Sequence, residues 1–384
     1  MDPKAMQAMR LRMLKRVLFT PEVCAGRGSI QRLACLDSGV RVLVVTGASA
    51  ARTGALQQVT AQLKDAASEI VTLPSGEPTA ATVSALSAQV SAFAPEWIAA
   101  VGGGSVLDSA KFLWAQYEHP ELTWRGPAAA IPPLRAKAHL ILAPTTSGSG
   151  SESSQAAVLV DDAGAKVPYV SAHWVPDLAI LDPSLTVSMP RALTASTGLD
   201  ALTHAVESAV SSLSHAMLRT LCGTAIRAIL RHLPEALRNG ENLAAREAMQ
   251  NASYLGGLCQ STASTGAAHA LSHATSARLG VAHGLGTGFY LLPTMRANLA
   301  KNAAVYDELA AECGFAGGAT LADAIEGLGR EAGLPATITV LAGRELSDED
   351  VKAVADGAGK DVCMRTNACR LAAADVQELV EKLR

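Results

Sequence analysis

Two side chains that could do chemistry share one face of a largely apolar stretch of the chain. The segment "GLDALTHAVES" (198–208) has the pattern of a helix, and it places Asp200 and His204 four positions apart. Residues at positions i and i+4 project from the same face of a helix. A carboxylate and an imidazole on one apolar face therefore predict a site where both side chains bind one ligand.

Three further histidines occur in a second segment, "GAAHALSHATSARLGVAHGLG" (266–286). His269 and His273 repeat the four-residue spacing, and His283 lies in a glycine-flanked turn. One carboxylate with several imidazoles suits Zn(II) or Fe(II), and three or four such ligands can leave a position open for substrate. A lone histidine at an apolar position is more often a core residue, but these two segments hold four of the nine histidines. We expect the other five to be surface or structural residues: His119, His139, His173, His215 and His232.

The elements that must position these residues fall into two patterns. At 384 residues, the chain exceeds what one hydrophobic core usually serves, so two domains are expected. Its first half alternates short β-rich runs with helical segments, which indicates βαβ units and a mainly parallel sheet. After about residue 190 the β-rich runs almost vanish and the pattern is helical. The expected strands are residues 40–45, 69–73, 97–101, 139–144, 156–160 and 178–183.

Glycine-rich or hydroxyl-rich turns follow three of these strands, where open α/β sheets bind ligands. In "VGGGSVLDSAK" (101–111), glycines let the backbone approach a pyrophosphate, and the helix that follows points its N–H groups at the charge. The hydroxyls of "APTTSGSGSES" (143–153) can line a phosphate, a ribose or a nicotinamide amide. The alternatives are a tight strand-to-helix turn and a solvated loop. The residues concerned are Gly102, Gly103, Gly104, Ser105, Thr145, Thr146, Ser147 and Ser149.

The third turn, "VVTGASAARTG" (44–54), bears on the choice of dinucleotide. Folds that bind NAD usually place an acidic residue where it meets the ribose 2′-hydroxyl. Here the strand ends in Gly47, followed by Ser49 and Arg52, so no carboxylate would repel a 2′-phosphate. The turn therefore favours NADP over NAD. The usual GxGxxG fingerprint is absent, which argues against an ordinary Rossmann dehydrogenase.

Several motifs in chain order carry a family resemblance. They are "GGGSVLDSAK", "PTTSGSGSE", "PDLAILDP", "TGLDALTHAVES" and the His269, His273 and His283 series. With them the chain resembles the iron-containing (group III) metal-dependent alcohol dehydrogenase family from about residue 18 to the C-terminus. The resemblance implies a dehydroquinate synthase-like fold. In that fold a dinucleotide-binding α/β domain (here 1–190) precedes an all-helical catalytic domain (191–384), and the active site lies in the cleft.

The resemblance also implies roles for individual residues. Asp200, His204, His269 and His283 match the metal ligands, and His273 matches an additional active-site histidine near nicotinamide and substrate. Gly102, Gly103, Gly104 and Ser105 match the pyrophosphate turn. The cofactor-lining positions correspond to Asp108, Thr145, Thr146 and Ser149, and a cleft lysine corresponds to Lys166.

The chain also departs from the family pattern. Gly47 replaces an acidic residue, as in the NADP-using members, so Ser49 and Arg52 would contact the phosphate. Residues 367–370, "NACR", replace the common Asn-Pro-Arg at a helix entry. Relatives that reduce maleylacetate lack the full ligand set, so its retention here argues against a metal-free reductase. The segment "TASTGLDALTHAVES" resembles the branch that reduces phosphonoacetaldehyde.

These features predict NAD(P)-linked interconversion of a small alcohol and its aldehyde. The metal would act as a Lewis acid toward the substrate oxygen, and His273 would pass the proton to solvent. Two alternatives stay open at this point. One is a non-redox enzyme of the dehydroquinate synthase type, which needs a sugar-phosphate site rich in Lys and Arg. The other is a non-catalytic scaffold with a structural metal, which would favour cysteine ligands.

Composition limits the partners and the location. The formal net charge is −3 and there is no basic tract, so we expect no nucleic-acid partner. Apolar runs are too short to span a membrane, and the first 19 residues lack the apolar core of a secretory signal. Seven scattered cysteines without a CxxC motif indicate reduced thiols in the cytoplasm. The family resemblance implies a homodimer or a larger homo-oligomer.

Overall fold

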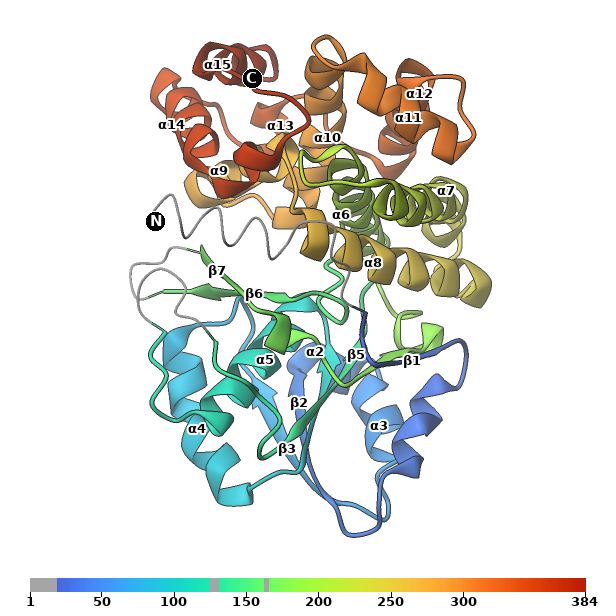
Figure 1. Cartoon of the computed structure of the whole chain (residues 1–384), viewed down its shortest axis with the longest axis vertical. Coiled ribbons are helices and arrows are strands. Elements are labelled where there is room, and N and C mark those ends of the chain that lie inside the picture. The colour runs from blue at the N-terminus through green and yellow to red at the C-terminus, as the bar shows by residue number, and fades with distance from the viewer. Residues whose placement is uncertain (1–18, 125–130, 162–165) are drawn as a thin grey trace. The chain divides into compact units, whose positions relative to one another are not determined.

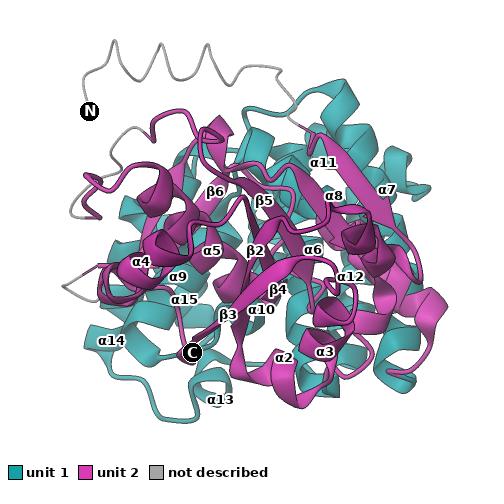
Figure 2. Cartoon of the chain, turned by 90° about the horizontal axis from the view of Figure 1, so that it is seen from below, with its two compact units in different colours: residues 1–17, 190–239, 255–384 teal, residues 18–189, 240–254 magenta. Residues whose placement is uncertain are grey.

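The computed structural model of the chain describes residues 19–124, 131–161 and 166–384 (Figure 1). These residues form two compact units, coloured separately in Figure 2. The sheet unit consists of the described residues up to Met189 together with Gly240–Tyr254. The helical unit consists of Pro190–Asn239 and Leu255–Arg384. The prediction that the chain carries no secretory signal falls mainly on residues 1–18, which lie outside the described residues.

The sheet unit is built on six parallel strands, which confirms the predicted α/β class. Their order across the sheet is β1-β8-β5-β4-β2-β3. The predicted β-rich runs account for all of these strands except the first, a four-residue edge strand. The strands are β1 (Glu22–Ala25), β2 (Arg41–Gly47), β3 (Ala67–Leu73), β4 (Trp97–Gly102), β5 (His139–Pro144) and β8 (Leu178–Leu181).

The run at 156–160 does not join this sheet. It forms β6 (Ala156–Val160), which pairs antiparallel with β7 (Lys166–Val170) in a separate two-stranded sheet. A parallel crossover needs a dozen or more residues and usually a helix. Only 11 residues without a helix separate β5 from β6, so this connection is too short to return the chain to the parallel sheet.

Helices cover both faces of the parallel sheet, as the continuous burial along its central strands requires. Leu43 and Val45 of β2 contribute to one apolar cluster, with α4 (Ala80–Phe93) and α5 (Gly104–Glu118). The intervening Val42 and Val44 contribute to the other, with three short helices. These are the 3₁₀ helix η1 (Ser29–Cys35), α2 (Ala48–Arg52) and α3 (Ala55–Thr60).

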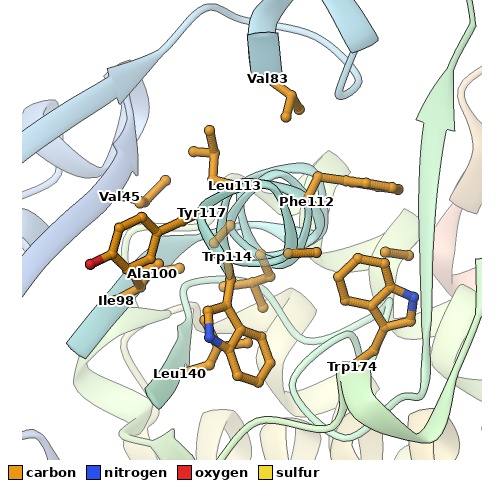
Figure 3. Packing of buried hydrophobic residues seen from close by; sticks show 14 of the residues in the cluster. Val45, Val83, Ile98, Ala100, Phe112, Leu113, Trp114, Tyr117, Leu140 and Trp174 are labelled. Atoms are coloured by element: carbon orange, nitrogen blue, oxygen red, sulfur yellow. The ribbon is translucent and has the colours of Figure 1, made fainter. Parts of the chain in front are cut away.

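Helix α5 is the centre of the larger cluster. Figure 3 shows Phe112, Leu113, Trp114 and Tyr117 projecting from it in different directions. Phe112 packs edge-on against Trp174 with ring centroids 5.3 Å apart, and the Trp114 indole donates a hydrogen bond to the Ala138 carbonyl at 2.9 Å. A helix fixed on all sides in this way holds the turn at its N-terminus in a defined place.

The described residues of the helical unit contain no strand, as the sequence predicts. None of the helices in the described part of the chain is long and apolar enough to cross a lipid bilayer. Helix α8 (Leu243–Ala263) contributes its first part to the sheet unit and its remainder to the helical unit. The other helices are α6 (Arg191–Val210), α7 (Ala216–Arg238), α9 (Ala267–Leu279), α10 (His283–Leu299), α11 (Ala303–Cys313), α12 (Gly318–Ala332), α13 (Ile338–Ala342), α14 (Asp348–Lys360) and α15 (Ala373–Lys382).

Candidate metal centre and dinucleotide turn

Three helices of the helical unit supply the candidate metal ligands (Figure 1). Asp200 and His204 lie one turn apart on α6, and His269 lies in the first turn of α9. His283 is the first residue of α10, directly after the short link from α9. The i, i+4 spacing places the side chains on one face of each helix, and the packing of the helices brings the two distant segments together.

Three of the four predicted ligands converge closely. Asp200 Oδ1 lies 3.9 Å from His269 Nε2 and 3.7 Å from His283 Nε2. One ligand atom from each residue falls within 4.8 Å of the other two. The side chains of Asp200 and His269 are nearly inaccessible, whereas His283 is 30% exposed. Asp200 and His269 thus form the buried part of the centre, and His283 lies on its more exposed side.

His204 lies beside this group and not within it. Its ring stacks on that of His269 with centroids 4.7 Å apart, and its Nδ1 is buried without a hydrogen-bond partner. His269 Nε2 is likewise buried and unpartnered. Buried polar atoms are nearly always satisfied, so such atoms call for an explanation. A divalent transition metal fits this set of imidazoles and one carboxylate.

The electrostatics of the centre favour a bound cation. Burial acts to raise the pKa of Asp200, but its electrostatic interactions with His204, His283 and His269 outweigh burial and hold that pKa below its usual value. The Thr287 hydroxyl adds to this effect by donating to Asp200 Oδ1 at 2.9 Å. Burial and the neighbouring imidazoles hold the pKa of His269 well below its ordinary value. These two shifts favour the ionised carboxylate and the neutral His269 ring, which are the forms that bind a metal.

Glycines at the start of α10 allow the helices to approach this closely. A Cβ on Gly284 would lie 2.9 Å from the Ser196 carbonyl oxygen of α6. A Cβ on Gly288 would lie 2.7 Å from Leu199 Cβ, and one on Gly286 would lie 2.5 Å from Ser272 Oγ of α9. The "HGLGTG" segment therefore seats α10 against α6 and α9, and this contact places His283 beside Asp200.

His273 lies one turn beyond His269, at the more open side of the centre. Its ring stacks on His283 with centroids 5.2 Å apart, and it is 37% exposed. Its Nδ1 contacts Asp361 Oδ2 at 2.9 Å, a partner that sequence reasoning missed because Asp361 lies 88 residues away. Burial acts to raise the pKa of Asp361, but the hydrogen bond with His273 lowers it to about 2. Asp361 and His273 also have ligand atoms within 4.8 Å of Cys363.

In the sheet unit, the strand β4 ends in the predicted pyrophosphate turn. A Cβ on Gly102 would lie 2.5 Å from Val106 Cβ, and one on Gly104 would lie 2.6 Å from Ser149 Oγ. The second turn is bonded to the first, since the Thr145 N–H donates to the Gly102 carbonyl at 2.9 Å. Thr146 lies 3.5 Å from a Cβ built on Gly103. The structure therefore brings the two predicted turns together.

A pocket of the sheet unit collects the residues of the third turn. Gly47, Ser49 and Arg52 line it together with Ser105, the predicted start of the helix α5. The loop after β3 completes the pocket with residues that the sequence reasoning missed, among them Ser75 and Gly76. Their signal is the turn sequence "PSGEPT" (74–79) at the end of a predicted strand.

Asp108 and Lys166 make other contacts in this structure. Asp108 Oδ2 accepts a hydrogen bond from the Val158 N–H of β6 at 2.9 Å, and burial raises its pKa. The Lys166 ammonium of β7 pairs with Glu77 at 2.7 Å. Glu77 lines the pocket, and Lys166 is not among its lining residues. The ion pair offsets the negative charge of the acidic lining residue.

Comparisons with known proteins identify the family of the chain. A model of the family described as iron-containing alcohol dehydrogenase matches residues 20–183. A model described as the C-terminal part of the Fe-containing alcohol dehydrogenase family matches residues 194–384. Together the two models span nearly the whole chain.

Individual relatives extend over the same length. The chain is 31% identical to an NADPH-dependent butanol dehydrogenase of Clostridium saccharobutylicum, over 96% of this chain and 97% of that protein. It is 35% identical to a 1-propanol dehydrogenase of Salmonella typhimurium, over 80% of this chain and 83% of that protein.

Solved structures show the same fold. An iron-containing alcohol dehydrogenase from Thermococcus thioreducens superimposes with a TM-score of 0.88 at 29% identity, covering 96% of this chain and 99% of that one. A sulfoacetaldehyde reductase from Bifidobacterium kashiwanohense in complex with NAD+ superimposes with a TM-score of 0.87 at 25% identity, covering 96% and 98%.

Proposed function

Because the chain belongs to the iron-containing alcohol dehydrogenase family and is therefore an NAD(P)-linked oxidoreductase acting on CH–OH groups, we propose that it reduces short aldehydes with NADPH. Asp200, His204, His269 and His283 are the ligands of an Fe(II) or Zn(II) ion in this proposal. The observation that carries it is the convergence of Asp200, His269 and His283, whose ligand atoms lie within 4.8 Å of one another.

The chemistry divides between the ion and the protein. A divalent ion held by these ligands supplies a Lewis acid for the substrate oxygen. Asp200 provides the negative charge of the site. The apolar packing of α6, α9 and α10 around Asp200 limits the access of water to the buried part of the centre. His273, which is partly exposed and bonded through Nδ1 to Asp361, passes the proton between the substrate oxygen and solvent.

The choice of NADP rests on the pocket of the sheet unit. Arg52 is exposed there and forms no ion pair with any residue in the described ranges. Glu77, the acidic residue of the pocket, is paired with Lys166. A 2′-phosphate would thus meet the Arg52 guanidinium and the Ser49 hydroxyl, and the one nearby carboxylate has its charge offset. The NADPH-dependent butanol dehydrogenase relative supports the same cofactor.

The relatives and one segment of the chain support the proposed substrate class. Two relatives are named for the four-carbon and three-carbon alcohols, and one solved structure for sulfoacetaldehyde. The "TASTGLDALTHAVES" segment of α6 resembles the branch that reduces phosphonoacetaldehyde. We therefore propose a short aldehyde, with an anionic two-carbon aldehyde as the specific candidate to test.

Location and assembly complete the proposal. The seven cysteines are all free in the structure, which is the state expected in the reducing cytoplasm. β1 forms one edge of the parallel sheet, and an edge strand can pair with a second copy of the chain. We propose a cytoplasmic homodimer or larger homo-oligomer, which light scattering on the purified protein tests.

The test is turnover with a panel of aldehydes. NADPH and NADH oxidation are measured with butanal, propanal, sulfoacetaldehyde and phosphonoacetaldehyde, for the wild type, His269→Ala and His232→Ala. We expect NADPH oxidation that depends on aldehyde, is lost in His269→Ala and is retained in His232→Ala, a histidine of α7 outside the centre. Equal turnover in His269→Ala would instead indicate a metal-free reductase of the maleylacetate type.

A further inference from the structure

A buried glutamate continues the polar face of α6 beyond the candidate ligands. Glu207 lies three residues after His204 and seven after Asp200, so all three project from one side of the helix. It is only 6% exposed. A carboxylate is costly to bury unless hydrogen bonds satisfy it, so its contacts need an account.

Two backbone N–H groups and the His269 ring surround the Glu207 carboxylate. Oε2 accepts from the Gly266 N–H at 2.8 Å and contacts His269 Nδ1 at 2.6 Å, and Oε1 accepts from the Ala268 N–H at 2.6 Å. The Gly266 and Ala268 N–H groups can only donate, and donors of this kind favour the ionised form of a carboxylate.

This contact determines which nitrogen of His269 faces the metal centre. An ionised carboxylate can only accept, so Nδ1 carries the ring hydrogen and Nε2 keeps its lone pair. Nε2 is the nitrogen that is buried without a partner, 3.9 Å from Asp200 Oδ1. We propose that Glu207 is a positioning residue that fixes the tautomer and orientation of His269 and thereby strengthens metal binding. This role rests on the proposed metal site.

The same carboxylate also holds the N-terminus of α9, which is an alternative reason for its presence. A Cβ on Gly266 would lie 2.9 Å from both Glu207 Oε1 and Asn367 Oδ1. Asn367 Oδ1 accepts from the Ala267 N–H at 3.2 Å and does not contact His269. Asn367 therefore accepts a hydrogen bond from a backbone N–H at the same end of α9 but makes no contact with His269, which makes it a matched control.

Zinc affinity, measured by competition with a chromophoric chelator, separates the two roles. Metal-ligand partners of this kind are worth about 10- to 100-fold in affinity. We expect Glu207→Gln to weaken zinc binding by about that factor, and Asn367→Ala to change it by less than about threefold. Wild-type affinity in Glu207→Gln, or an equal loss in both variants, would overturn the role. A wild type that binds no zinc would overturn the metal site itself and this role with it.

A second measurement avoids reliance on a variant that could fail to fold. In the zinc-loaded wild type with ¹⁵N-labelled histidine, NMR distinguishes Nδ1–H from Nε2–H for each ring, and His269→Ala assigns the signal. We expect a hydrogen on Nδ1 of His269, protected from exchange with solvent. A hydrogen on Nε2, with Nδ1 bound to zinc, would contradict the proposal whatever the affinities show.

Discussion

Arg52 is the residue on which the proposed preference for NADPH depends. Its side chain lines the pocket after β2, where no described carboxylate pairs with it. Loss of one charge-assisted contact to a phosphate costs about 1.5–3 kcal/mol. We expect Arg52→Ala to raise KM for NADPH about tenfold or more and to leave KM for NADH nearly unchanged. Arg27→Ala, an exposed arginine of the same unit outside the pocket, is the control. An equal change for both cofactors would contradict the assignment.

Asp361 offers a test of how His273 acts. An amide in its place can still accept from the Cys363 N–H, which bonds Oδ1 at 2.8 Å, but it loses the charge that faces His273. We expect Asp361→Asn to lower kcat by about tenfold, since general acid–base catalysis contributes 10²–10⁴-fold in total. Its metal content should equal that of the wild type. Unchanged kcat would show that the orientation of His273 does not matter for turnover.

The turn between β4 and α5 is an element in which two neighbouring glycines should behave differently. A Cβ on Gly104 would lie 2.6 Å from Ser149 Oγ, which is a steric clash. A Cβ on Gly103 would lie 3.5 Å from Thr146 Cγ2, which is an ordinary van der Waals contact. Overpacking costs about 1–3 kcal/mol. Gly104→Ala should therefore lower the free energy of unfolding by about that amount, and Gly103→Ala by less. Denaturant unfolding measures both, and equal losses would contradict this account of the turn.

The N-terminus of α14 contains a carboxylate whose contribution to stability should depend on pH. Hydrogen bonds from Arg344, the Ser347 backbone and Arg278 hold the pKa of Asp350 well below its usual range. The folded state thus binds a proton less readily than the unfolded state, whose aspartate pKa is about 4. The stabilisation is complete above that value and is lost as pH falls below it. Asp350→Asn should lower the midpoint of thermal unfolding at pH 7, with a gap to wild type that narrows below about pH 4.

Asp348→Asn provides the comparison for Asp350→Asn. Asp348 lies in the same first turn of α14, but its side chain is 94% exposed. The same change of charge there should alter the midpoint little, because exposed ion pairs contribute less than about 1 kcal/mol. A pH-independent effect of Asp350→Asn, or an effect equal to that of Asp348→Asn, would show that the buried hydrogen bonds are not the cause.

Periodicity predicted the elements that have a regular pattern and missed those defined by pairing. The runs at 40–45 and 97–101 became β2 and β4 because each is apolar and leads into a turn and a helix. The run at 156–160 looks the same in sequence, and only its partner β7 reveals that it belongs to a separate sheet. Asp200 and His204 stood out on an apolar face, but Glu207 did not, because a glutamate in a helix usually faces solvent. Asp361 could not be found at all, since its contact with His273 is made only in the fold.

At the scale of the whole molecule, the two units carry separable tasks. The sheet unit holds the turns and the pocket proposed for the dinucleotide, and the helical unit holds the complete set of candidate metal ligands. A ligand that binds only the folded chain stabilises it by about 4 kcal/mol at a thousand times its Kd. Metal removal should therefore lower the unfolding midpoint of the helical unit and spare NADPH binding.

Metal content measured together with turnover tests the central claim most directly. The chain is loaded with Fe(II) or Zn(II) and analysed by mass spectrometry as wild type, after chelation, as His269→Ala and as His232→Ala. We predict one equivalent of metal and NADPH-dependent aldehyde reduction in the wild type and in His232→Ala. We predict neither after chelation nor in His269→Ala. Aldehyde reduction that continues undiminished after chelation and in His269→Ala would contradict the metal centre and indicate a metal-free reductase.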